Sequence, residues 1–240
     1  PLVLELKNLT EKESGKNNTS YTNFCNNLAE IYKNQGKYSQ AELLYFESKN
    51  IREKISGKES SEYAYSCNNL AGLYLQENKY PQAEALFIES KNIREKISGK
   101  ESSEYAEACI NLAGLYQNQG KNTEAESLLV EAKNIFNKIL GNEHPKYAIS
   151  CENLAYLYKN QEKHTEAESL LIEAKNIYEK RFGKQHPSYI ASLNKLAIIY
   201  EIQGKYAQAE LLLLGSKNDI AKVLGKEHPD YAIFCNNLAS

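Results

Sequence analysis

The chain has 240 residues and a formal net charge of −2, and 42% of its residues are hydrophobic. With 29 basic and 31 acidic residues it offers no excess of positive charge for nucleic acid or an anionic membrane. No stretch approaches the roughly 20 apolar residues that cross a bilayer, so we expect no membrane insertion. The low content of Gly (12) and Pro (5) favours an all-α protein without long linkers.

A period of 42 residues runs through the whole chain and is marked by the tripeptide Asn-Leu-Ala. The tripeptide begins at Asn27, Asn69, Asn111, Asn153 and Asn237, and Lys195 replaces the asparagine in one further copy. A fixed period of this length is typical of a solenoid, in which each repeat buries its apolar face against its neighbours. We therefore expect one domain over residues 1–240, with its function on a surface.

In chain order, the predicted elements begin with a partial second helix, here called helix B, over residues 1–14. Five complete repeats follow, each with a helix A and a helix B, over residues 15–56, 57–98, 99–140, 141–182 and 183–224. A partial helix A over residues 225–240 ends the chain. In 99–140 the apolar residues recur at helical spacing from Tyr105 to Tyr116 and again from Ala125 to Ile139. Because both ends lie inside a repeat, we expect a piece of a longer protein.

Local signals predict where these helices start and how they approach one another. Capping boxes predict helix B starts at Ser39, Thr123 and Thr165, each of which has Glu three residues later. His-Pro dipeptides precede three of the A helices, at His144, His186 and His228. These three histidines stand one to a repeat, a spacing that forbids their convergence on a metal. Small residues such as Ala29 and Ala41 predict close contact between helices A and B.

Five cysteines share one phase of the repeat: Cys25, Cys67, Cys109, Cys151 and Cys235. Leu193 fills the sixth place, so the position is apolar. Equivalent positions on stacked helices lie about 8–10 Å apart, which is too far for a disulfide. We expect buried, reduced thiols, which suit an intracellular and specifically cytoplasmic protein.

The pattern resembles the tetratricopeptide repeat, whose 34-residue consensus places small and bulky residues at fixed positions along a helix pair. In the first repeat those positions are Cys25, Leu28, Ala29, Tyr32, Ala41, Tyr45 and Ser48. The longer period, with Asn-Asn-Leu-Ala, Gln-Gly-Lys-Tyr and Gly-Lys-Glu-His-Pro, is similar to the repeats of kinesin light chains and their bacterial relatives. The resemblance implies a right-handed superhelical solenoid of antiparallel helix pairs. It also implies a scaffold that binds a peptide or partner protein in a concave groove lined by the A helices.

An asparagine ladder on the A helices supplies the first candidates for partner binding. An amide is both donor and acceptor, so a row of amides can hold the backbone of an extended peptide; equally, each can tie the helices together. With their neighbours on the same groove the candidates are Asn26, Asn27, Tyr65, Asn68, Asn69, Asn111, Asn153 and Asn194.

Departures from the repeat supply the second set of candidates, with drift near the end of the array as the alternative. Tyr156 and Ile198 replace glycines, Lys195 replaces Asn, and Ile202 replaces Asn or Gln. With Lys159 they predict an apolar and cationic patch of the kind that interface hot spots contain. Shared residues are less informative, because residues 47–64 and 89–106 are identical and indicate a recent duplication. The Lys-Asn dipeptide that starts at Lys49 and recurs on helix B is expected on a solvated convex face or in a hydrogen bond between repeats.

The sequence contains no Gly-rich phosphate loop, no His-Glu-x-x-His and no Gly-x-Ser-x-Gly, so we expect no catalytic residue, no cofactor and no metal site. The expected partner is a protein or peptide, not nucleic acid. The alternative function is a regulatory sensor, or a self-assembling array, of a larger signalling protein whose catalysis lies elsewhere. End-to-end self-association belongs to that alternative.

Overall fold

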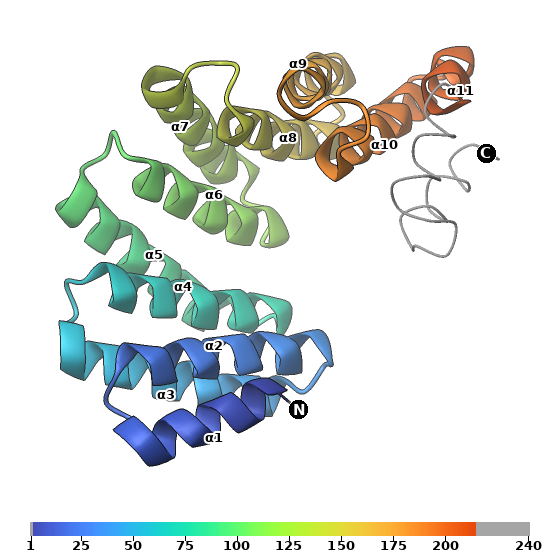
Figure 1. Ribbon diagram of the computed structural model, residues 1–240. Coiled ribbons are helices and arrows are strands. Elements are labelled where there is room, and N and C mark those ends of the chain that lie inside the picture. Colours follow the sequence, from blue (N-terminus) through green and yellow to red (C-terminus); the bar gives the residue numbers. More distant parts are fainter. Residues whose placement is uncertain (1, 215–240) are drawn as a thin grey trace. The chain divides into compact units, whose positions relative to one another are not determined.

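The computed structural model describes residues 2–214, and every regular element in this range is an α-helix (Figure 1). The helices are α1 (Leu2–Ser14), α2 (Thr19–Asn34), α3 (Tyr38–Ser56), α4 (Ser61–Gln76), α5 (Tyr80–Ser98), α6 (Ser103–Asn118), α7 (Asn122–Leu140), α8 (Pro145–Asn160), α9 (His164–Phe182), α10 (Pro187–Ile202) and α11 (Tyr206–Leu214). The predicted A helices are α2, α4, α6, α8 and α10, with 16 residues each. The B helices α3, α5, α7 and α9 have 19 residues each. The predicted all-α class and the alternation of A and B helices are confirmed.

The chain forms two compact parts, Pro1–Ala125 and Glu126–Ser240, which we call the N-terminal part and the C-terminal part. In the N-terminal part each helix from α1 to α6 packs on the next, and the A helices α2, α4 and α6 also touch in sequence. In the C-terminal part α8, α9, α10 and α11 pack in the same serial way. Serial packing of this kind is the contact pattern of a repeat array.

Small residues lie where helices A and B approach most closely. Ala29 of α2 and Ala41 of α3 are fully buried, and they pack with Leu70 of the next repeat. Ala155 and Ala167 form the same contact between α8 and α9. The predicted role of these alanines is confirmed, since a larger side chain at a fully buried position would have to displace the facing helix.

The capping boxes predicted at Ser39, Thr123 and Thr165 are wrong, because α3, α7 and α9 begin before these residues. The cap positions of α3 and α9 are Lys37 and Lys163, and neither makes a side-chain capping bond. The backbone sets the start instead. Gly36 has φ of 72°, and this turn lets the Lys37 N–H donate to the Tyr32 carbonyl at 2.8 Å, so helix B begins at once.

The glutamates of the expected boxes join consecutive repeats instead of capping their own helix. Glu42 accepts hydrogen bonds from the Tyr74 hydroxyl at 2.8 Å and from the Lys79 ammonium at 3.3 Å. We call this set the Glu–Tyr–Lys tie. The tie recurs as Glu84 with Tyr116 and Lys121, and as Glu126 with Tyr158 and Lys163. Partial burial opposes ionisation of Glu126, but the hydrogen bonds it accepts prevail and lower its pKa.

Side chains do cap the A helices. Asn18, Ser60 and Ser102 each accept the backbone N–H three residues on. The predicted His-Pro turns serve the same purpose, because His144 and His186 use Nδ1 to accept the N–H two residues on, at 3.1 Å. These histidines are therefore capping residues, and His228 lies outside the described residues.

The cysteine positions are buried, as predicted. Cys25, Cys67, Cys109 and Cys151 are buried and form no disulfide among the described residues, and Leu193 at the same phase is fully buried too. Burial, with a further contribution from Glu89, raises the pKa of Cys67 to about 12, and burial beside Glu173 does the same for Cys151. Cys235 lies outside the described residues.

We predict that Ser60→Ala lowers the free energy of unfolding by about 1 kcal/mol, because it removes the cap of α4. Ser39→Ala is the matched control and should change it by less than about 0.5 kcal/mol, since Ser39 is an exposed residue inside α3. Urea unfolding followed by circular dichroism measures both. Equal losses in the two variants would contradict the helix starts described above.

We predict that the cysteines of the folded protein are slow to react with a disulfide reagent such as dithionitrobenzoate at pH 8. Thiolate is the reacting species, and a raised pKa leaves little of it. The measurement uses Cys235→Ser, so that only Cys25, Cys67, Cys109 and Cys151 are counted. All four should react at once in denaturant, and an added exposed thiol, Ser39→Cys, should react at once in the folded protein. Fast labelling of the folded chain without Ser39→Cys would refute the buried assignment.

Candidate partner-binding site

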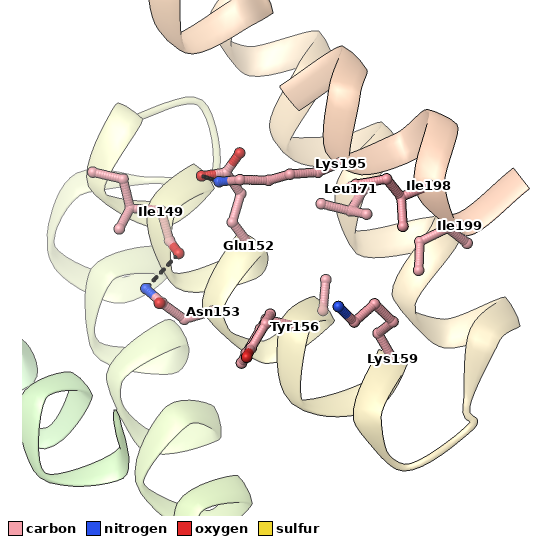
Figure 2. Close-up of a pocket in the computed structure, with 10 residues that line it drawn as sticks. Ile149, Glu152, Asn153, Tyr156, Lys159, Leu171, Lys195, Ile198 and Ile199 are labelled. Carbon is pink, nitrogen blue, oxygen red and sulfur yellow. Dashed lines mark hydrogen bonds and ion pairs between the residues drawn. The ribbon is translucent and has the colours of Figure 1, made fainter. Parts of the chain in front are cut away.

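A cavity of about 530 Å³ lies between α8 and α10 in the C-terminal part (Figure 2). Three helices line it: Ile149, Glu152, Asn153, Ala155, Tyr156 and Lys159 from α8, Leu171 from α9, and Lys195, Ile198 and Ile199 from α10. The cavity thus brings together the following predicted partner-binding residues: Asn153, Tyr156, Lys159, Lys195 and Ile198.

The floor of the cavity is a buried apolar layer, and its edges are exposed apolar side chains. Leu171 and Ile199 belong to the core cluster that packs α8, α9 and α10 together. Above them Tyr156 is 54% exposed and Ile149 is 46% exposed. Exposed apolar edges over an apolar floor are typical of a ligand-binding surface.

Two edge residues of the cavity stand where other A helices carry glycine. Tyr156 and Ile198 occupy the positions of Gly72 in α4 and Gly114 in α6. A Cβ atom at either glycine would meet no atom within 4 Å, so the fold leaves open space at this position. The side chains of Tyr156 and Ile198 therefore add apolar surface that packing inside the array does not require.

One ion pair crosses the cavity. The Lys195 ammonium lies 2.8 Å from Glu152 Oε2 (Figure 2). The Tyr178 hydroxyl donates to the same oxygen at 3.3 Å. Glu152 Oε1 is buried and has no hydrogen-bond partner among residues 2–214. Lys159 lies over the ring of Tyr156, 4.8 Å from its centroid. The cavity therefore combines an apolar surface, two ammonium groups and a buried acceptor oxygen that no described group satisfies.

Members of the asparagine ladder differ in their contacts. Asn111 donates to Asn68 Oδ1 at 2.7 Å, which ties α6 to α4. Asn153 donates to the Ile149 carbonyl of its own helix at 2.9 Å. The ion pair of Glu152 and Lys195 occupies the positions of Asn68 and Asn111, so Lys195 departs from the ladder together with its partner.

The other candidates do not line the cavity. Asn27 is exposed and Asn69 is half-buried. Asn26 is 5% exposed, and its side-chain amide atoms have no hydrogen-bond partner among the described residues. Asn194 Oδ1 is also buried without such a partner. Tyr65 on α4 is 48% exposed, and Ile202 on α10 is also 48% exposed.

A buried arginine lies beside Tyr65. Arg52 reaches from α3 towards α2 and α4, is 3% exposed, and donates to Asn23 Oδ1 at 2.6 Å. Its guanidinium lies 5.3 Å from the centroid of the Tyr65 ring. Burial lowers the pKa of Arg52, which remains a cation.

Sequence reasoning missed Glu152, Ile149, Leu171 and Ile199 as cavity residues. A signal for Glu152 was present, because other A helices carry Asn26, Asn68, Ile110 and Asn194 at its position. Glu152 introduces an acid at this position, and Lys195 introduces a lysine in the following repeat. Two such changes of opposite charge indicate an ion pair. The apolar residues carry no such signal, since apolar residues are expected throughout the repeat.

Three further expectations concern the helix B lysines, metal binding and membrane insertion. Lys49 lies 5.0 Å from the centroid of the Tyr63 ring in the next repeat, so its contact between repeats is a cation–π interaction instead of the hydrogen bond expected as one alternative. Within residues 2–214 no group of His, Cys, Asp and Glu is arranged to hold a metal ion. A search of the same residues for a helix long and apolar enough to span a membrane finds none.

Comparison with known proteins places the array in a family. The sequence pattern that defines the tetratricopeptide repeat matches residues 20–96, 104–162 and 148–214. Two structures described as a kinesin light chain with nearly identical TPR-like repeats, from Podosopora anserina, are 28% and 29% identical to this chain, with TM-scores of 0.69 and 0.67. Each alignment covers 82% of this chain, and 93% or 94% of the other.

BtubC from P. vanneervenii has the same fold, with a TM-score of 0.75 at 21% identity over 95% of this chain and 89% of that chain. A search of curated proteins gives no match.

We predict that Lys195→Ala lowers the free energy of unfolding by about 1 kcal/mol, because it leaves the Glu152 carboxylate largely buried without its cation. Glu152→Asn combined with Lys195→Asn copies the pair of Asn68 and Asn111, and should recover most of the loss. Urea unfolding of Glu152→Asn, of Lys195→Asn and of the double variant measures the coupling. Additive losses would show that the two side chains do not stabilise each other.

Proposed function

The chain belongs to the tetratricopeptide repeat family of protein-interaction scaffolds, and we propose that the cavity between α8 and α10 receives a peptide segment of a partner protein. One observation carries the proposal: three of the four A-helix departures, Tyr156, Lys195 and Ile198, line the same cavity together with Lys159, whereas Ile202 lies outside it. Unrelated drift would be expected to scatter such changes over several surfaces. Here three of the four lie beside a buried apolar floor with exposed apolar edges.

The chemistry of the cavity favours a peptide with a bulky apolar side chain. Tyr156 and Ile198 stand on facing helices, and Leu171 closes the space between them (Figure 2). Burial of one Leu- or Phe-sized side chain there contributes about 1.5–3 kcal/mol. A cavity of about 530 Å³ falls within the range of known ligand pockets, which runs from about 300 to 1,000 Å³.

We expect the backbone of the bound peptide to be recognised by the Glu152 carboxylate rather than by the lysines. Lys195 is held by Glu152, so its charge is largely neutralised within the site. Glu152 Oε1 lacks a donor among the described residues, and an unbonded buried carboxylate oxygen is costly. Because this oxygen is buried, a peptide N–H can donate to it only after side chains at the cavity edge move aside. Such a bond would remove the cost and would fix the position of the peptide backbone beside the apolar contact.

The test begins with recovery of partners from the source cell, using the full chain as bait. Overlapping synthetic peptides from each recovered partner then locate the bound segment, and fluorescence anisotropy measures its affinity. Light scattering on the same samples separates partner capture from self-association of the array.

We predict that Tyr156→Ala and Ile198→Ala each weaken binding of that segment by about thirtyfold, the effect of losing an interface hot spot of about 2 kcal/mol. Melting should change little for Tyr156→Ala, since more than half of this side chain is exposed. Tyr206→Ala is the matched control, because Tyr206 is 65% exposed and lies on α11 outside the cavity. Undiminished binding by both cavity variants would remove the cavity from the function.

A further inference from the structure

A second surface lies on the B-helix side of the N-terminal part. A groove of about 380 Å³ is formed by α3 and the turn between α1 and α2. It contains Leu43, which is 72% exposed, and Phe46, which is 51% exposed. Lys16 and Lys54 also line it. We call it the first-repeat groove, and none of its residues belongs to the cavity between α8 and α10.

The chain provides a natural comparison one repeat later. An equivalent groove of about 390 Å³ is formed by α5 and the turn between α3 and α4; we call it the second-repeat groove. The two grooves have the same residue types at all but three lining positions. Asn17, Leu43 and Phe46 of the first-repeat groove correspond to Glu59, Ala85 and Ile88 of the second.

These three differences change the charge and the apolar surface of the groove. In the second-repeat groove Glu59 lies 2.6 Å from the Lys96 ammonium and neutralises it. Glu143 and Lys180 form the same ion pair in the C-terminal part. In the first-repeat groove Asn17 stands in place of the glutamate, and Lys54 forms no ion pair with any described residue. Lys54 is therefore an open cation beside exposed Leu and Phe.

The apolar residues of the first-repeat groove are not required by the fold. The second repeat folds in the same way with Ala85 and Ile88 at these positions, so Leu43 and Phe46 add surface without adding a structural contact that the repeat needs. Contiguous exposed apolar surface marks interaction sites, whereas apolar side chains scattered singly do not.

We propose that the first-repeat groove binds a short acidic segment of a partner protein, which packs one bulky apolar side chain on Leu43 and Phe46 and places a carboxylate beside Lys54. Charge selects this occupant. Lys16 is already held by Glu47 at 3.0 Å and by Glu11 at 3.5 Å, whereas Lys54 is open, so the groove attracts a carboxylate and repels a basic segment. The site is separate from the cavity of the proposed function.

The experiment uses the full chain and two sets of labelled synthetic peptides. One set carries Leu or Phe among Asp and Glu; the other carries the same apolar residues among Lys. The key variant is Asn17→Glu with Leu43→Ala and Phe46→Ile, which gives the first-repeat groove the residues of the second. It is expected to fold, because the same side chains occur one repeat later, and circular dichroism checks this.

The acidic set should bind the wild-type chain, and the triple variant should weaken that binding at least about tenfold. Lys54→Ala should weaken it as well and reduce its dependence on salt. Tyr156→Ala should leave it unchanged, so this result and the one for the cavity between α8 and α10 are independent. Equal binding of the lysine set, or undiminished binding by the triple variant, would overturn the proposal.

The same samples test two other occupants of the first-repeat groove, a lipid surface and a second copy of the chain. Binding of anionic phospholipid vesicles, but not of acidic peptides, would overturn the proposal in favour of a lipid surface. A concentration-dependent dimer that the triple variant abolishes, without peptide binding, would overturn it in favour of a second copy of the chain.

Discussion

The stacking of consecutive repeats depends on one carboxylate in the first turns of helix B. In the Glu–Tyr–Lys tie, Glu42 receives the hydroxyl of Tyr74 and the ammonium of Lys79, both from the following repeat. The ring of Tyr74 packs at the same time on the cluster that contains Ala29, Ala41 and Leu70. A single tyrosine thus supplies both the apolar and the polar contact between two repeats. Since no repeat buries a core alone, the array is as stable as these junctions.

The fold could be predicted from the sequence because its signals are periodic, whereas the helix starts could not. Helical spacing and the small residues at Ala29 and Ala41 determine which faces are buried. A Ser or Thr followed three residues later by Glu has two readings, since that carboxylate can return to its own helix or reach the next repeat. The backbone determines where helix B starts: Gly36 is in the left-handed region, and the Lys37 N–H donates to the preceding helix. Side-chain patterns do not report it.

The site was partly predictable for a related reason. Comparison of equivalent positions reveals Tyr156 and Lys195 as departures, and the structure places both on one cavity. Lys195 pairs with Glu152, which lies one repeat and one residue earlier in the chain. The bond between Asn68 and Asn111 has the same separation of 43 residues. A comparison at the period of 42 aligns Glu152 with Asn68, and Lys195 with Asn111, but never Glu152 with Lys195. Departures in a repeat protein are therefore best read in pairs that span a junction.

The same reasoning separates residues that maintain the array from residues that are free for another role. Lys195 has a partner inside the array, so its change from asparagine is accounted for by Glu152. Tyr156 and Ile198 have no such account, because the glycines at their positions leave open space. Leu43 and Phe46 are in the same situation, since Ala85 and Ile88 suffice one repeat later. In a repeat protein each residue can be compared with the residues at the same position of the other repeats. Exposed apolar surface that the other repeats lack is available to a partner, and in this chain it occurs both on the A helices and on a B helix.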